Sequence, residues 1–397
     1  MIGNQHSVAV HWTGDFDDNA LRDWARNVRA QLGENPVSLG LVFLSPRHFD
    51  KAPEILENLR LNARIPLLVG CSSNSLIAGS AEIEEHPGVA LGLYSLPGAD
   101  LKVVRFTQEQ LEEHTGPAYW HLQTEITTEQ TNGWLVFADP FHLDCESWLR
   151  TWNEAYAPLP VVGGLASGDY SQQRTQIYLN GDVYEEGGVA VSIAGKVELA
   201  SVISQGCTPI GETWTITKAE QNIIFEIANR PAYQVLIDTI QKLPPAEQKK
   251  CQGNLFVGLV INEYLDEFHR GDFLIRNLIG ADPNSGALAV GALPRSGQTI
   301  QFQRRDAAAG TEDMTQLLGR ARNNLKGREV LGACLCSCNG RGARLFGVPS
   351  HDAGHVQKQF GPIGLAGFFC NGEIGPVGDK NFLHGYTASL ALFVRKS

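Results

Sequence analysis

The chain has 397 residues, of which 43% are hydrophobic and 19% are charged, and its formal net charge at pH 7 is −11. At about 150 residues per domain this length exceeds what one hydrophobic core usually covers, so we expect two domains. The acidic balance excludes a general attraction to phosphate backbones or anionic lipids, and neither nucleic acid nor a membrane is an expected partner.

The first twenty residues contain no basic segment leading into an apolar core, and no apolar run reaches the roughly 18 residues that a membrane helix requires. We therefore expect a soluble, cytoplasmic protein. Its eight cysteines are too sparse for a disulfide scaffold and are expected to be free thiols in a reducing compartment.

Residues 17–32 carry the clearest helical pattern of the chain. Leu21, Ala25, Val28 and Leu32 recur on one face, acidic residues lie at the start and a glycine follows the end. The pattern predicts an amphipathic helix that covers one face of a sheet.

Three later segments repeat one order of elements: a buried strand, a helix, a second strand, a polar or glycine-rich turn and a closing strand. The first has strands at 41–44, 67–70 and 89–93 and helical residues at 52–59. The second has strands at 134–137, 161–163 and 189–193 and helical residues at 145–152. The third has strands at 332–336, 365–369 and 389–394 and helical residues at 353–360. The chain is thus expected to be internally repetitive.

A strand-rich stretch without such helices lies between the second and third segments. Its predicted strands are 255–260, 273–278, 287–291 and 299–303, and helices are predicted at 230–242 and 312–325. We place a domain boundary near residue 230, giving domains 1–230 (core about 35–215) and 231–397. The expected fold class is α/β, of the α+β kind, with two closely packed domains of mixed, largely antiparallel sheets and helices on their outer faces.

Three cysteines alternate along the predicted strand that ends in Cys334-Leu335-Cys336-Ser337-Cys338. Alternate strand residues share a face, so the three thiols line one side and Cys338 stands at the strand end, beside Asn339 and Arg341. Burial in a core, a ligand or redox role for Cys338, and a metal site all remain open. The paired Cys-x-x-Cys spacing of a structural zinc site is absent, and no metal or cofactor is expected.

Two glycine turns earlier in the chain are further candidates. Cys71 and Ser72 follow Gly70 in a turn that resembles a nucleophile elbow, although the second glycine of that motif is missing. Gly163 and Gly164 end the second strand of the second segment. Glycine lets a ligand approach the backbone closely, so either turn is a ligand-binding loop or a plain turn.

The third turn places Cys370, Asn371 and Glu373 directly after a buried strand. Glu373 either binds a ligand, acts as a general base or caps backbone amides, and His384 eleven residues on either joins it or is structural. Arg276 interrupts an apolar strand-like segment and needs a carboxylate partner or an anionic ligand.

Five motifs together resemble the FIST family, named for F-box and intracellular signal transduction proteins. They are Ser204-Gln205-Gly206-Cys207-Thr208-Pro209-Ile210-Gly211, Leu274-Ile275-Arg276-Asn277-Leu278-Ile279-Gly280, Arg304-Arg305-Asp306-Ala307, Cys338-Asn339-Gly340-Arg341-Gly342 and Gly367-Phe368-Phe369-Cys370-Asn371-Gly372-Glu373-Ile374-Gly375-Pro376. The resemblance covers roughly residues 35–395 and implies an N-terminal FIST domain followed by its C-terminal partner domain.

The resemblance also implies a cytoplasmic sensory or scaffold module that binds a small ligand, an amino acid or a related metabolite. Other members are coupled to kinases, cyclase-type output domains or ubiquitin-ligase F-boxes. Here no output domain is expected, so the signal passes to a separate signalling protein or through self-association.

Three functions follow as hypotheses. The first is a non-catalytic ligand-binding module using the turn residues above. The second is a cysteine-dependent enzyme with Cys338 or Cys370 as nucleophile and Glu373 or His384 as base. The third is a protein-interaction scaffold, for which a homo-oligomer would be one sign.

Overall fold

A computed structural model describes residues 3–84 and 86–396 and divides the chain into two compact units. The first unit combines residues 1–203 with residues 317–397, and the second unit is residues 204–316. The compact units therefore differ from the linear division near residue 230, because the third segment of the chain returns to the unit formed by the first two.

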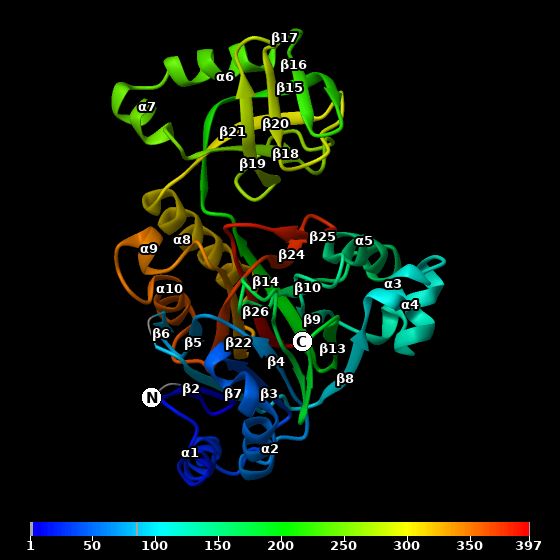
Figure 1. The fold of residues 1–397 in the computed structure, drawn as a ribbon, viewed down its shortest axis with the longest axis vertical. Coiled ribbons are helices and arrows are strands. Elements are labelled where there is room, and N and C mark those ends of the chain that lie inside the picture. Colours follow the sequence, from blue (N-terminus) through cyan, green and yellow to red (C-terminus); the bar gives the residue numbers. More distant parts are fainter. Residues whose placement is uncertain (1–2, 85, 397) are drawn as a thin grey trace. The chain divides into compact units, whose positions relative to one another are not determined.

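The fold class is mixed α/β, as the sequence predicts, and the three repeated segments are confirmed as three structural repeats (Figure 1). Repeat one consists of β2 (Ser7–Thr13), β3 (Leu39–Leu44), α2 (Ala52–Asn62), β4 (Leu68–Ser72), β5 (Leu76–Ala78), β6 (Ala81–Ile83) and β7 (Gly88–Tyr94). Repeat two consists of β8 (Ala99–Phe106), β9 (Trp134–Ala138), α5 (Cys145–Tyr156), β10 (Val161–Leu165), β11 (Ile177–Leu179), β12 (Asp182–Tyr184) and β13 (Gly188–Gly195). Repeat three consists of β14 (Val197–Ser204), β22 (Val330–Cys338), α10 (His351–Phe360), β23 (Leu365–Cys370), β24 (Glu373–Val377), β25 (Lys380–His384) and β26 (Ala388–Arg395).

Between its opening strand and its first buried strand, each repeat carries additional elements. Repeat one has α1 (Asp18–Ala30) there, begun by the Asp17 side chain, which accepts a hydrogen bond from the Ala20 amide, as the sequence pattern predicts. Repeat two has α3 (Gln108–Glu112) and α4 (Pro117–Thr124). Repeat three has the whole second unit, followed by the remainder of α8 (Ala307–Asn324). Short elements β1 (Gly3–Asn4), η1 (Pro46–Lys51), η2 (Thr128–Gln130) and α9 (Ala343–Phe346) complete the first unit.

The three repeats build three sheets by exchanging hairpins. In each repeat the first two buried strands pair in parallel, and the closing strand pairs antiparallel to the first of them. The hairpin that follows the second strand joins another repeat: β5–β6 adds to β23, β11–β12 to β4, and β24–β25 to β10. Every sheet of this unit therefore contains strands from two repeats.

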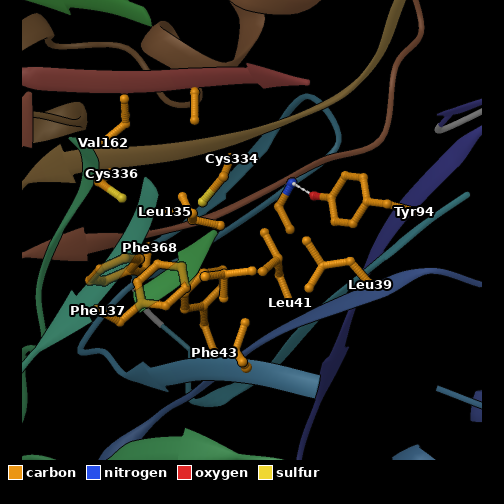
Figure 2. Close-up of a cluster of buried hydrophobic side chains, with 14 of the residues drawn as sticks. Leu39, Leu41, Phe43, Tyr94, Leu135, Phe137, Val162, Cys334, Cys336 and Phe368 are labelled. Atoms are coloured by element: carbon orange, nitrogen blue, oxygen red, sulfur yellow. Dashed lines mark hydrogen bonds between the residues drawn. The ribbon is translucent and has the colours of Figure 1, made fainter. Parts of the chain in front are cut away.

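A shared core lies between the inner faces of these three sheets (Figure 2). The alternation of a strand sends Leu41 and Phe43 of β3 into this core, and Val42 outward against α1 and α2. Phe43 stacks on Phe368 of repeat three and meets Phe137 of repeat two edge to face, with ring centroids 4.7 and 5.4 Å apart. All three repeats thus meet around one aromatic cluster.

One glycine in each second strand is required by close packing. At Gly70, Gly163 and Gly367 a Cβ atom would lie 1.7–2.0 Å from the carbonyl oxygen of the residue paired with it. The three glycines therefore mark equivalent positions, and the residues around them can be compared repeat by repeat.

The second unit is a closed antiparallel barrel. Its elements are β15 (Cys207–Glu220), β16 (Ile223–Ile227), β17 (Arg230–Pro231), α6 (Ala232–Gln241), α7 (Pro245–Cys251), β18 (Leu255–Val260), β19 (Phe273–Asp282), β20 (Ala287–Val290) and β21 (Thr299–Arg305). The order β15-β21-β18-β19-β20-β16 closes on itself through the β15–β16 pairing. Val235 and Leu236 of α6 pack into the barrel core with Phe302. The sequence places the start of this helix at 230, but Arg230 and Pro231 pair with β16 and the helix begins at Ala232.

Candidate functional site

The first two buried strands of each repeat end side by side, and their last residues differ sharply in chemistry. Counting from the equivalent glycines, repeat one ends in Ser45 and Ser73, and repeat two in Asp139 and Ala166. Repeat three ends in two cysteines, Cys338 and Cys370, which are directly paired across β22 and β23. The same pair of adjacent strand ends therefore carries two thiols in repeat three.

The hairpin strand next to these ends shows a second difference. Glu373 of β24 pairs with Gly164, as Leu76 pairs with Phe368 and Ile177 with Cys71 at the equivalent positions. All three hairpin residues are buried, and Glu373 has no exposed surface. A carboxyl group thus stands where the other two repeats place an apolar side chain.

Glu373 is held by one backbone amide and two thiols. Its Oε2 accepts a hydrogen bond from the Thr387 amide at 2.9 Å, and its Oε1 accepts one from the Cys370 thiol at 3.2 Å. The Cys338 thiol hydrogen-bonds to the same carboxyl group. Burial raises the pKa of Glu373 to about 8, against the opposing effect of these hydrogen bonds and of the Arg341 charge.

The two thiols differ in exposure. Cys370 is fully buried, it also lies 3.3 Å from the Ser337 carbonyl oxygen, and burial raises the pKa of its thiol well above the ordinary value. Cys338 is partly exposed, and its sulfur accepts a hydrogen bond from the Gly340 amide at 3.4 Å. A reagent from solution therefore reaches Cys338 first.

Arg341 lies directly behind this cluster and is fully buried. Its guanidinium donates two hydrogen bonds to Asp352 of α10, at 2.6 and 2.9 Å, and the carboxylate also accepts from Ser337 and His351. Burial opposes ionisation of Asp352, but the charges and hydrogen bonds of Arg341 and His351 together lower its pKa below the usual range. These hydrogen bonds join the loop after β22 to α10.

A second buried carboxyl group supports the same helix from another repeat. Glu82 of β6 accepts a hydrogen bond from the Ala353 amide in the first turn of α10, at 2.8 Å. Burial and the neighbouring Asp352 charge raise the pKa of Glu82 to about 7. The exchanged hairpin of repeat one thus anchors the helix that carries Asp352.

Polar side chains lie at the outer end of the strands, next to the thiols. Asn339 donates a hydrogen bond to Asn371 Oδ1 at 2.7 Å, and the hydroxyl of Tyr170 hydrogen-bonds to the same oxygen. Tyr170 is 57% exposed and belongs to the loop between β10 and β11. Asn371 Nδ2 is buried and has no hydrogen-bond partner among residues 3–84 and 86–396. Within that part of the chain, one buried amide donor is therefore left without an acceptor.

The residues of the two earlier glycine turns make contacts within the protein core and backbone. Cys71 is fully buried in the shared core, and burial raises the pKa of its thiol. The Ser72 hydroxyl joins two backbone segments, donating to the Ser167 carbonyl and accepting from the Gln176 amide, both at 2.9 Å. Gly163 packs against the Val136 carbonyl. Gly164 leaves room for the thiols, because a Cβ there would lie 3.2 Å from Cys370 Sγ.

The remaining two candidates lie outside the thiol cluster. His384 is buried on β25, paired in register with Glu373, and its ring nitrogen Nε2 lies 3.0 Å from the Gly375 carbonyl oxygen. Arg276 belongs to the barrel unit, where it is half-buried on β19 and donates to the Ile275 carbonyl at 3.0 Å. The structure thus brings together Cys338, Asn339, Arg341, Cys370, Asn371 and Glu373.

Sequence reasoning missed Tyr170, Asp352, Glu82 and Thr387. A signal for Tyr170 exists in the length of its loop: five residues separate the equivalent glycine from the paired hairpin residue in repeats one and three, but thirteen in repeat two. Within the described part of the chain, no group of three or more His, Cys, Asp or Glu side chains is arranged to hold a metal ion. No helix among those residues combines the length and hydropathy needed to span a membrane.

Comparison with known proteins places two family models on the chain. The FIST N domain matches residues 38–230, and the FIST C domain matches residues 232–376. An uncharacterized protein of Mycobacterium tuberculosis is 36% identical over 375 residues, covering 94% of this chain and 96% of the relative. An uncharacterized protein of Mycobacterium bovis is 36% identical over 387 residues, covering 98% of both chains. A more distant one, from Methanocaldococcus jannaschii, is 21% identical over 272 residues, which cover 66% of this chain and 50% of that protein.

Proposed function

The chain belongs to the FIST family, and from that premise we propose that it is a small-molecule-binding sensory module whose site lies at the strand ends of repeat three. The observation that carries the proposal is the buried Glu373 carboxyl group, which replaces Leu76 and Ile177 of the other repeats. Burying a carboxyl group costs stability that an apolar side chain would not, so the fold alone gives no reason for it.

The polar side chains next to the thiols support a proposal for the chemistry of the ligand. Asn339, Asn371 and Tyr170 offer amide and hydroxyl groups, which both donate and accept hydrogen bonds. Asn371 Nδ2 lacks an acceptor among the residues that the structure describes, and a carboxylate oxygen of the ligand would supply one. An amino acid or a related small metabolite carries matching groups, and we propose this class as the ligand.

Thermal unfolding of the full chain against a panel of amino acids and related metabolites tests the proposal, because a ligand of the native state raises the melting temperature with its concentration. We expect at least one compound to raise the melting temperature of the wild type, and Asn371→Ala to abolish that shift. Asn74→Ala, at the equivalent position of repeat one, is the matched control and should keep it. A panel without any shift, or a shift that survives in Asn371→Ala, would contradict the proposal.

A second candidate function, a cysteine-dependent enzyme, is favoured by one specific contact. Cys338 is partly exposed and hydrogen-bonded to Glu373, whose pKa of about 8 suits a general base near neutral pH. The fully buried Cys370 is the weaker nucleophile of the two. Alkylation of Cys338 with iodoacetamide across pH 5–10 tests this: the rate of an activated thiol follows the ionisation of Glu373 and changes in Glu373→Gln, whereas an ordinary thiol profile in both proteins rules the enzyme out.

Location and partners belong to the same proposal. Eight cysteines in 397 residues are too sparse for a disulfide scaffold, which supports a reducing, cytoplasmic compartment. We propose that the bound state is read by a separate signalling protein or through self-association. Native mass spectrometry of the purified chain measures stoichiometry and any co-purifying ligand together, and a bare monomer would remove self-association from the proposal.

A further inference from the structure

Two cysteines at the strand ends of repeat three are placed by the backbone within reach of one another. Cys338 and Cys370 are register partners on the parallel strands β22 and β23. Neighbouring strands lie about 4.8 Å apart, and partners in a parallel ladder carry their side chains on the same face. A disulfide spans Cα separations of about 4.4–6.8 Å, so these strands already hold the two residues at a suitable spacing.

The two thiols also share one proton acceptor. Cys370 Sγ lies 3.2 Å from Glu373 Oε1, and the Cys338 thiol hydrogen-bonds to the same carboxyl group. The Gly340 amide donates to Cys338 Sγ and so favours negative charge on that sulfur. The partly exposed Cys338 therefore has an acceptor for its proton and a donor for the resulting thiolate.

We propose that Cys338 and Cys370 form a hydroperoxide-reactive dithiol site, with Cys338 as the attacking thiol and Cys370 as the resolving thiol. In the first step the ionised, carboxylate form of Glu373 takes the Cys338 proton, and the thiolate attacks the terminal oxygen of a hydroperoxide. The S–O bond forms as the O–O bond breaks, two electrons pass from sulfur to the peroxide, and the leaving oxygen takes up the proton as water or an alcohol. Cys338 is then a sulfenic acid.

The second step joins the two strands. Cys370 Sγ attacks Cys338 Sγ, the S–S bond forms as the S–O bond breaks, and hydroxide leaves as water with the proton that Cys370 passes through Glu373. Because Cys370 is fully buried, its proton is lost only to this internal carboxyl group. The products are one disulfide and water.

The other cysteines of β22 serve as internal controls. Cys334 and Cys336 lie on the same strand, but their register partners are Ala366 and Phe368, and both thiols are buried in the shared core. Their thiols hydrogen-bond to each other, but their Cα atoms, two residues apart on one strand, are about 6.6 Å apart, near the upper limit for a bridge. An oxidant without site preference would oxidise Cys334 and Cys336 to the same extent as Cys370.

The disulfide would take both thiol donors away from Glu373 and draw the two strand ends together beneath Asn339 and Asn371. Only this effect on ligand binding rests on the proposed function. The oxidation itself requires no ligand, so its test is independent of the ligand panel.

The test uses the reduced full chain with hydrogen peroxide, followed by denaturation, alkylation of the remaining thiols and peptide mass spectrometry. In the wild type we expect a peptide pair linked through Cys338 and Cys370, two hydrogens lighter than the separate peptides, with Cys334 and Cys336 fully alkylated. Glu373→Gln should form the link at least about tenfold more slowly, because general base catalysis contributes that much or more. Cys370→Ser should stop at a sulfenic acid on Cys338, captured by a dione probe, and Cys338→Ser should form no link.

Two results would overturn the proposal: wild-type Cys338 and Cys370 that stay alkylatable after peroxide, or Cys338 oxidised without linkage to Cys370. A melting curve for each variant shows that it is folded. Should a serine variant not fold, the wild-type linkage map and the Glu373→Gln rate decide alone. Loss of ligand binding with intact linkage would count against the proposed function only.

Discussion

Repeats one and three share a backbone but not a chemistry at their strand ends. Ser45, Ser73 and Leu76 in repeat one occupy the positions of Cys338, Cys370 and Glu373 in repeat three. The Ser73 hydroxyl hydrogen-bonds to the carbonyl oxygens of Ser75 and Phe369, and Leu76 packs in the shared core. The comparison shows that the fold requires strands ending at these positions but does not require titratable side chains there. The thiols and the carboxyl group of repeat three are therefore candidates for function rather than for architecture.

Moving the carboxyl group to repeat one should have the largest effect. Leu76→Glu places it in the shared core without the thiols and amide that hold Glu373, so we expect the free energy of unfolding to fall by about 4 kcal/mol or more. Urea denaturation measures it. Glu373→Leu is the converse control and should cost less than about 2 kcal/mol. Equal losses in both variants would mean that position 373 requires its carboxyl group for stability as strongly as position 76 excludes one.

Removing the support of the Cys338 loop should come next. Asp352→Asn leaves the fully buried Arg341 without its counter-charge, and we expect a loss of about 3 kcal/mol. The exposed pair of Lys51 with Glu54 gives the control, since Glu54→Gln should change stability by less than about 0.5 kcal/mol. An equally small loss for Asp352→Asn would show that Arg341 finds another partner.

The pH dependence of stability should distinguish Glu373 from its apolar counterparts. Its folded pKa of about 8 is raised above the ordinary 4.5, so the stability it contributes is fully present below pH 4.5 and is lost as pH rises toward 8. We expect Glu373→Gln to gain stability relative to the wild type as pH rises, by about 3 kcal/mol between pH 5 and pH 7.5. Paired urea titrations at pH 5 and 7.5 measure the gain.

Glu82 titrates over a similar range, with a pKa raised to about 7, but it is present in both proteins and cancels in the difference. The double variant with Glu82→Gln checks this. A gap between wild type and Glu373→Gln that does not change with pH would mean that Glu373 is ionised throughout.

The smallest effect is expected at Tyr170, the contribution of repeat two. Tyr170→Phe removes a hydroxyl from an exposed side chain that hydrogen-bonds to Asn371, and should lower stability by no more than about 1 kcal/mol. Differential scanning calorimetry measures this. A larger loss would mean that the long loop of repeat two is part of the folding core rather than an addition to the strand ends.

Much of the fold was predictable because its signals are local. The period-two and helical patterns predicted all three repeats, and the alternation of Cys334, Cys336 and Cys338 predicted that the three thiols share one face with Cys338 at the strand end. That Cys334 and Cys336 lie in a core was one of the alternatives left open. Glu373, Cys370 and Asn371 were named as candidates from a single turn, and the structure places them side by side. The pairing of the β5–β6 hairpin with β23 could not be predicted, because no local sequence pattern shows which distant strand a given strand pairs with.

Tyr170 and Asp352 were missed for a related reason. Tyr170 comes from a loop some two hundred positions before Asn371, and only the tertiary structure joins them. Asp352 looks like any acidic residue near a helix start until Arg341 is seen beside it. The unequal loop lengths and the odd carboxyl group are visible in the amino-acid sequence once the three repeats are aligned on Gly70, Gly163 and Gly367.

The exchange of hairpins also fixes when the protein can finish folding. During synthesis the outer edge of β10 stays unpaired until residues 373–377 leave the ribosome, and β14 stays unpaired until residues 388–395 follow. The barrel, residues 204–316, is contiguous in sequence and is complete before either of these strands exists. Residues 373–395 therefore close two of the three sheets, and a chain cut short before them would present open strand edges to its neighbours rather than a smaller folded protein.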